Sequence, residues 1–337
     1  MDTFSEVYQK SVEVLKTQSL DDSWKKIESN LKMMLKPDGP DAGQARSLDE
    51  LRDYLHEIGK GGGATASAQA EAMLKAANVG TPGFQERAAF LKTMQHFYLV
   101  EKKGNQSVWV MDPPKNLTAW PYDQFAGKTK EGIKTDLMLA VEIFGDANRQ
   151  MMSDSLQLAR KWSMEVQIKL AAAEPSTLEI VKRWFHAGGD DEQKVLATTA
   201  TLLTGFKKIT NACNSTNVTF SDLPHLRDDF DGDGTFAAVA EGETRPVIYL
   251  FKEFLKLGSP NKMGVIPKLW LCALTVVHEL THSLLQTEDI KYDHQGLNVR
   301  PGFSHKDALN NAESWAYLAA DLVGAVSEAD RKKALRQ

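Results

Sequence analysis

Hydrophobic residues recur at helical spacing along most of this chain. Ile27, Leu31 and Leu35 follow one another every four residues, and a second apolar face runs from Leu48 to Ile58. Residues at this spacing lie on one side of an α-helix, so both stretches are predicted to be amphipathic helices. Further helices are predicted for residues 66–77, 83–98 and 134–173, for two stretches after Pro175, for residues 269–285 and for residues 307 to about 326.

Shorter stretches have the composition of β-strands. Residues 97–100 and 107–111 are rich in aromatic and β-branched side chains and flank Lys103-Gly104-Asn105, a pattern typical of a hairpin. Residues 217–220 and 236–250 also have β character. Many helices with a few short strands predict an α+β fold that is mainly helical and holds a small antiparallel sheet.

A turn-rich connection from Pro113 to Pro121 separates two parts of the chain. We therefore expect a mostly helical N-terminal domain of unknown role at residues 1–125 and a second domain at residues 126–337. Helix, turn, helix and hairpin in the first part also outline a winged-helix module. No basic recognition helix stands out, so a small α+β domain is the preferred interpretation.

Net charge, apolar stretches and cysteine content limit the classes of protein to which this chain is expected to belong. The 337 residues carry a formal net charge of −5, which does not favour a nucleic-acid partner. No apolar stretch is long enough to predict a transmembrane segment. The N-terminus has no basic segment followed by an apolar core, so no signal peptide is predicted; a cytoplasmic protein or export without a leader is expected. The two cysteines, Cys213 and Cys272, are interpreted as reduced buried thiols rather than as a disulfide.

The strongest chemical signal is His278-Glu279-Leu280-Thr281-His282 within the apolar stretch 269–285. Two histidines four residues apart share one face of a helix, so both imidazoles can reach one metal ion. Zinc accepts this pair, and the glutamate can act as general base for a water molecule. The sequence therefore predicts a catalytic zinc ion with His278 and His282 as ligands and Glu279 as the base.

A catalytic zinc ion usually has a third protein ligand. Metzincins would need a glycine and a third histidine where this chain has Leu285 and Glu288, so that arrangement is excluded. A gluzincin would use a glutamate on a later helix, and Glu313 is available for that role. An aspartate just after the metal-binding helix is the other option, and Asp289 is available there.

The segment from Gln286 to Asp293 and two further stretches resemble the aspzincins, the deuterolysin and peptidyl-lysine metalloendopeptidase family. Thr287, Asp289 and Tyr292 occupy the positions of the G-T-x-D-x-x-Y-G signature, whereas Gln286 and Asp293 replace its glycines. Residues 308–317 are similar to the downstream N-A-D-S-Y-A-Y helix, and residues 247–254 to the strand before the metal-binding helix. The resemblance covers roughly residues 150–325.

The resemblance implies a zincin-like metallopeptidase domain at residues 126–337 with one zinc ion bound by His278, His282 and Asp289. Glu279 would activate water, Tyr292 would donate to the oxyanion, and Glu313 would hydrogen-bond a ligand histidine. The implied function is a zinc endopeptidase acting on a protein or peptide substrate. Its layout fits a bacterial effector or toxin with a delivery or immunity partner for the N-terminal domain. The alternatives are an inactive zincin-fold binding module and a gluzincin-like peptidase that uses Glu313.

A second acidic segment, Asp229-Phe230-Asp231-Gly232-Asp233-Gly234, matches the first half of a calcium-binding loop. The position that should hold a bidentate glutamate is Ala240, which excludes a standard EF-hand. An acidic surface turn is therefore the default interpretation, and a calcium-stabilised loop the alternative.

Overall fold

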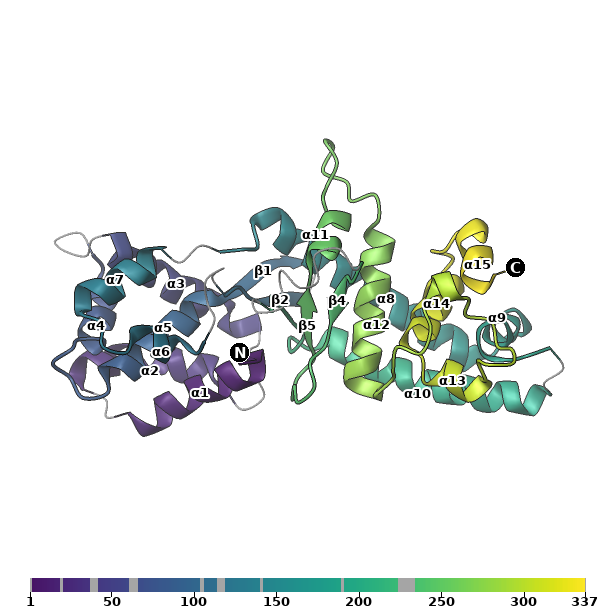
Figure 1. Ribbon diagram of the computed structural model, residues 1–337, viewed down its shortest axis with the longest axis horizontal. Coiled ribbons are helices and arrows are strands. Elements are labelled where there is room, and N and C mark those ends of the chain that lie inside the picture. The colour runs from purple at the N-terminus through teal and green to yellow at the C-terminus, as the bar shows by residue number, and fades with distance from the viewer. Residues whose placement is uncertain are drawn as a thin grey trace. The chain divides into compact units, whose positions relative to one another are not determined.

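The computed structural model describes residues 2–18, 21–36, 42–60, 66–103, 106–113, 119–139, 142–188, 191–223 and 234–336 (Figure 1). Its contacts divide it into two compact units. The first comprises Met1–Gln150, Thr216–Thr235 and Ala240–Lys252, and the second comprises Met151–Ser215, Phe236–Val239 and Glu253–Gln337. The expected boundary between residues 125 and 126 lies inside the first unit. The division into functional domains at that point stays a prediction.

Side-chain caps define where the N-terminal helices begin. Thr3 and Glu6 form a capping box, and the Asp21 carboxylate accepts hydrogen bonds from the backbone amides of Ser23 and Trp24. The helices of the first unit are α1 (Phe4–Thr17), α2 (Asp22–Met34), α3 (Ala45–Lys60), α4 (Ala68–Ala76), α5 (Phe84–His96), α6 (Pro121–Phe125) and α7 (Lys130–Leu139), with a 3₁₀ turn η1 at Ala42–Gln44.

The sheet is mixed, so the prediction of an antiparallel sheet is wrong. Strands β1 (Phe97–Lys103) and β2 (Gln106–Met111) form the predicted antiparallel hairpin. Strand β2 then pairs in parallel with β3 (Thr219–Ser221), and β3 pairs in parallel with β5 (Val247–Leu250). Parallel neighbours need long crossover connections, which the intervening segments supply. A pattern of short strands does not reveal which of them will pair across such distances.

Helices make up most of the second unit. They are α8 (Asp146–Ala172, which begins in the first unit), α9 (Pro175–Phe185), α10 (Glu192–Asn214), α11 (Lys252–Leu257, whose first residue belongs to the first unit), α12 (Leu269–Leu285), α13 (His305–Leu309), α14 (Ala312–Leu322) and α15 (Glu328–Leu335), with the strand β4 (Ala237–Ala238) and the 3₁₀ turn η2 (Asp293–Gln295). Helix α12 packs against α14 and α10, and α9 packs against both of those helices (Figure 1). None of the helices in the described ranges combines the length and the apolar character needed to span a bilayer.

An aromatic core holds α9, α10 and α14 together. Trp315 of α14 packs against Phe185 of α9 and Phe206 of α10, and its indole nitrogen donates to the Leu309 carbonyl at 2.8 Å. Gly205 of α10 allows this approach, because a Cβ added there would lie 2.4 Å from the Trp315 ring. Cys213 and Cys272 are also buried in this unit, as predicted.

We expect Gly205→Ala to destabilise the protein by about 1–3 kcal/mol, since the added methyl overpacks a rigid indole. Chemical denaturation measures this loss. Gly132→Ala is the matched helical control, because the nearest atoms lie 3.6 Å from its added Cβ. That change is expected to be neutral or to stabilise by up to about 1 kcal/mol. Equal stability of the wild type and Gly205→Ala would contradict the packing described here.

One sequence expectation needs correction near the C-terminus. The single helix expected from residue 307 to about 326 is two helices, α13 and α14, separated at Asn310-Asn311, and α15 follows as an additional helix. Asparagine favours caps over helix interiors because its side chain competes for backbone hydrogen bonds, and here it marks the break.

The acidic segment Asp229–Asp233 lies outside the described residues, so its calcium interpretation stays a prediction.

Candidate metal centre

Helix α12 spans the residues predicted for it, Leu269–Leu285, and carries His278, Glu279 and His282. Every residue from Cys272 to Thr281 is buried, so the helix is packed on several sides rather than along one stripe. The two histidines lie one helical turn apart, with their Nε2 atoms 3.0 Å from each other. The helix therefore presents two imidazole nitrogens and one carboxylate from a buried segment.

The helix ends at Gln286, which adopts the left-handed conformation with φ 59° and ψ 37°. The signature that this segment resembles has glycine here, the residue that adopts this conformation most easily. Gln286 adopts this conformation although it is not a glycine. The chain can therefore turn sharply out of α12 and bring the next residues back toward the histidines.

A β-branched residue at position 286 would be strained in this conformation. We expect Gln286→Val to lower the free energy of unfolding by about 1 kcal/mol, because β-branching adds crowding to the left-handed strain that Gln286 already bears. Gln286→Gly, the control, is expected to keep or slightly raise stability. Thermal or chemical unfolding distinguishes the two. Similar losses for both variants would show that the side chain, and not the backbone conformation, matters here.

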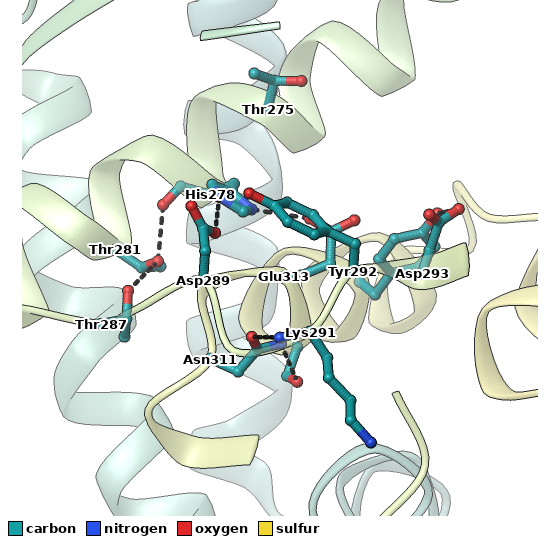
Figure 2. A network of polar contacts seen from close by, with 12 residues as sticks. Thr275, His278, Thr281, Thr287, Asp289, Lys291, Tyr292, Asp293, Asn311 and Glu313 are labelled. Atoms are coloured by element: carbon teal, nitrogen blue, oxygen red, sulfur yellow. Dashed lines mark hydrogen bonds and ion pairs between the residues drawn. The ribbon is translucent and has the colours of Figure 1, made fainter. Parts of the chain in front are cut away.

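The turn brings Asp289 to the two histidines, and Figure 2 shows its side chain beside His278. Its Oδ1 atom lies 3.0 Å from Nε2 of His278 and 3.3 Å from Nε2 of His282. Zinc bonds of about 2.0–2.1 Å in tetrahedral geometry separate neighbouring ligand atoms by about 3.3 Å. In the described part of the chain, these three residues form the group whose donor atoms all lie within 4.8 Å of one another. The donor set therefore fits a zinc ion in both chemistry and spacing.

The Nδ1 nitrogen of each imidazole also has a hydrogen-bond partner. Nδ1 of His278 lies 2.8 Å from Oε2 of Glu313, and Nδ1 of His282 lies 2.6 Å from the carbonyl oxygen of Thr287. Both acceptors require Nδ1 to carry the proton, which leaves the Nε2 lone pairs for a metal ion. Glu313 contacts the imidazole edge opposite to Asp289.

These contacts shift the pKa values of the cluster. Burial lowers the pKa of His278, but hydrogen bonds with Asp289 and Glu313 outweigh it and raise the pKa to about 10. Burial would raise the pKa of Asp289, whereas the two imidazoles hold it well below its usual range. The cluster therefore binds a proton strongly, and a metal ion would replace that positive charge.

Glu279 lies on α12 beside these groups and is buried. Its Oε2 atom has no hydrogen-bond partner among the described residues, and burial raises the pKa of its carboxyl group. A buried carboxylate oxygen without a partner costs folding free energy. Such an atom is typical of a group that is kept for chemistry rather than for stability.

Tyr292 follows Asp289 in the same loop, and Figure 2 shows its ring turned back toward His278 and Asp289. The ring is nearly parallel to the His278 imidazole at 6.3 Å between centroids, and Tyr292 is 39% exposed. Burial and the Asp289 carboxylate raise the pKa of its phenol. Lys291, between them in sequence, extends away from the cluster in Figure 2.

The structure adds residues to the site that sequence reasoning missed. Asn311 is fully buried and accepts hydrogen bonds from the loop that carries Asp289. Thr281 and Thr287 join their hydroxyl groups at 2.8 Å across the turn after α12. A capping signal at Asn311 was present in the sequence, because asparagine before an apolar helical stretch often begins a helix.

The comparison with known protein families agrees with the predicted resemblance to the aspzincins. Residues 170–320 match the family model described as lysine-specific metallo-endopeptidase, the aspzincins. No curated protein matches the chain. The matched range contains α9, α10, α12 and most of α14, and therefore the whole cluster of His278, His282 and Asp289. The match at residues 170–320 thus confirms the resemblance to the aspzincin family for the C-terminal part of the chain.

Proposed function

We propose that this protein is a zinc-dependent endopeptidase in which His278, His282 and Asp289 bind the metal ion and Glu279 is the general base. The observation that carries the proposal is the placement of three metal-binding atoms within 4.8 Å of one another beside a buried, unpartnered carboxylate oxygen. The family match supports metallo-endopeptidase activity in general. The assignment of single residues rests on the geometry.

Each residue has a role that its position supports. When bound, zinc supplies a Lewis acid that polarises a carbonyl group and lowers the pKa of water. Glu279 takes a proton from the attacking water and passes it to the leaving amine. Tyr292 keeps its phenolic proton at neutral pH, because the ordinary pKa of tyrosine is about 10, and donates it in a hydrogen bond to the developing oxyanion.

Glu313 is the alternative third ligand, and the geometry favours Asp289 over it. The Glu313 carboxylate contacts Nδ1 of His278, whereas Asp289 lies at the Nε2 atoms of both histidines. A carboxylate on the Nδ1 side orients the imidazole and raises its basicity. We therefore propose that Glu313 supports His278 without binding the metal ion.

The purified full-length chain tests the proposal directly. We expect about one zinc ion per chain by metal analysis, and cleavage of casein or of a mixed peptide library into fragments with new amino termini. Chelation should abolish cleavage, and added zinc should restore it. A chain that binds zinc fully and cleaves nothing would contradict the peptidase proposal and favour a binding role for the same fold.

We further propose that the protein acts as a secreted bacterial effector or toxin, with its N-terminal residues 1–125 serving delivery or regulation. The support is that the family match begins at residue 170, so residues 1–125 lie outside the matched range. Induced expression inside host cells tests this role. Growth inhibition by the wild type and not by Glu279→Gln is expected, and equal growth with both proteins would contradict it.

A further inference from the structure

Asp289 is the proposed zinc ligand that no helix positions. His278 and His282 are fixed on α12, whereas Asp289 lies in the loop between α12 and η2, and its side chain is 42% exposed. A ligand on a loop binds a metal ion tightly only if the loop is held in place. The residues that hold this loop therefore bear on the metal affinity.

The loop is bound on both sides of Asp289 to the break between α13 and α14. On one side, the Glu288 amide donates to the Asn310 carbonyl at 2.7 Å, and the Glu288 carbonyl accepts from the Ala312 amide at 3.1 Å. On the other side, Oδ1 of Asn311 accepts from the backbone amides of Ile290 at 2.9 Å and Lys291 at 2.8 Å. The two amides that directly follow Asp289 thus share one side-chain oxygen.

The hydrogen bonds of the Asn311 side chain are not explained by capping of α14. Asn311 occupies the N-cap position, yet its side chain makes no capping hydrogen bond to the helix that it precedes. Its Nδ2 atom instead donates to the Ser314 hydroxyl at 3.0 Å, which orients the amide so that its oxygen faces the loop. The residue is fully buried, so water does not replace these contacts. Its side-chain oxygen holds the loop, and its side-chain nitrogen fixes the amide to Ser314 of α14.

We propose that Asn311 is a positioning residue for zinc, which fixes the Asp289 carboxylate at the Nε2 atoms of His278 and His282. This inference rests on the proposed function, since it takes Asp289 as a metal ligand. Groups that orient a metal ligand typically change metal affinity by about 10–100-fold when they are removed. The loss of the oxygen shared by Ile290 and Lys291 is expected to weaken zinc binding within that range.

The test is the zinc dissociation constant of full-length variants, measured by competition with a chromophoric chelator. Asn311→Ser keeps a group that can cap α14 but is too short to reach both loop amides. It is expected to bind zinc about 10–100-fold more weakly than the wild type. Asn311→Asp keeps an acceptor for both amides and can accept from Ser314, so it is expected to retain tight binding.

Tyr317→Phe is the matched control. It removes the hydrogen bond from the Tyr317 hydroxyl to Asp293 at 3.0 Å, which holds the same loop further along and away from Asp289. We expect wild-type zinc affinity for this variant. Equal weakening by Tyr317→Phe and Asn311→Ser would overturn the proposal, because loss of any loop contact would then have the same effect.

Folding of each metal-free variant is checked by circular dichroism and thermal unfolding. If Asn311→Ser does not fold, Ser314→Ala replaces it, since that change leaves Asn311 in place but removes the hydroxyl that orients its amide. Weaker zinc binding supports the proposal, and unchanged binding overturns it. If the wild type binds no zinc, the proposed function itself fails. If the wild type binds zinc and Asn311→Ser binds it equally tightly, only the role of Asn311 is refuted.

Discussion

Replacement of Glu279 by glutamine is expected to reduce peptide hydrolysis by about 10²–10⁴-fold, the usual contribution of a general acid–base group. Glutamine has nearly the same shape as glutamate but cannot accept the proton from water. Because Glu279 is not one of the three proposed ligands, bound zinc should stay at the wild-type level. Rates of peptide cleavage and metal content, measured on the same preparation, check both parts.

The stability of Glu279→Gln provides an independent measurement. The buried Oε2 atom of Glu279 has no partner among the described residues, so removal of the charge should relieve a desolvation cost. We therefore expect an unchanged or higher melting temperature together with lost activity, the combination typical of catalytic residues. A variant that keeps wild-type cleavage rates would show that Glu279 is not the base.

Removal of Asp289, the proposed third ligand, should reduce metal binding rather than change the chemical step itself. We expect Asp289→Ala to weaken zinc binding by more than about 100-fold, beyond the range of about 10–100-fold for groups that only orient a ligand. The reason is that Asp289 supplies both a donor atom and the negative charge beside two imidazoles. Equilibrium zinc binding measures this loss, and peptide cleavage should fall with the bound metal.

Glu313→Gln is the control for this comparison. The amide oxygen of the glutamine can still accept the hydrogen bond from Nδ1 of His278. We therefore expect zinc affinity to fall by no more than about 100-fold. The opposite order, with Glu313→Gln losing zinc and Asp289→Ala retaining it, would identify Glu313 as the third ligand. That result would place the site with the gluzincin arrangement.

The sequence predicted the metal-binding helix because its signals are local. A mainly apolar stretch without glycine or proline defines α12, and the spacing of His278 and His282 follows from helix geometry alone. The placement of Asp289 beside them was implied by the resemblance of the loop. Because Gln286 stands where the signature has glycine, the sequence did not reveal how the chain turns after α12. The structure shows Gln286 in the left-handed conformation that glycine adopts most easily.

The contacts between distant segments could not be read from local patterns. Residues 307–326 carry helical spacing throughout, so nothing in the periodicity revealed that the helix breaks at Asn310-Asn311. The break depends on hydrogen bonds to Glu288, Ile290 and Lys291, some twenty residues earlier. The parallel pairing of β2, β3 and β5 is likewise decided by packing over long distances.

The mixed sheet also has a consequence for how the chain folds during synthesis. In the sheet, Trp109 lies beside Thr219, and Thr219 lies beside Val247. Contacts between residues so far apart in sequence form slowly, because a long loop must close before they contribute stability. The ribosome must therefore release about the first 250 residues before the sheet that starts near residue 97 is complete. Until then the edge of β2 stays unpaired, and an unpaired strand edge can bind strands of other chains.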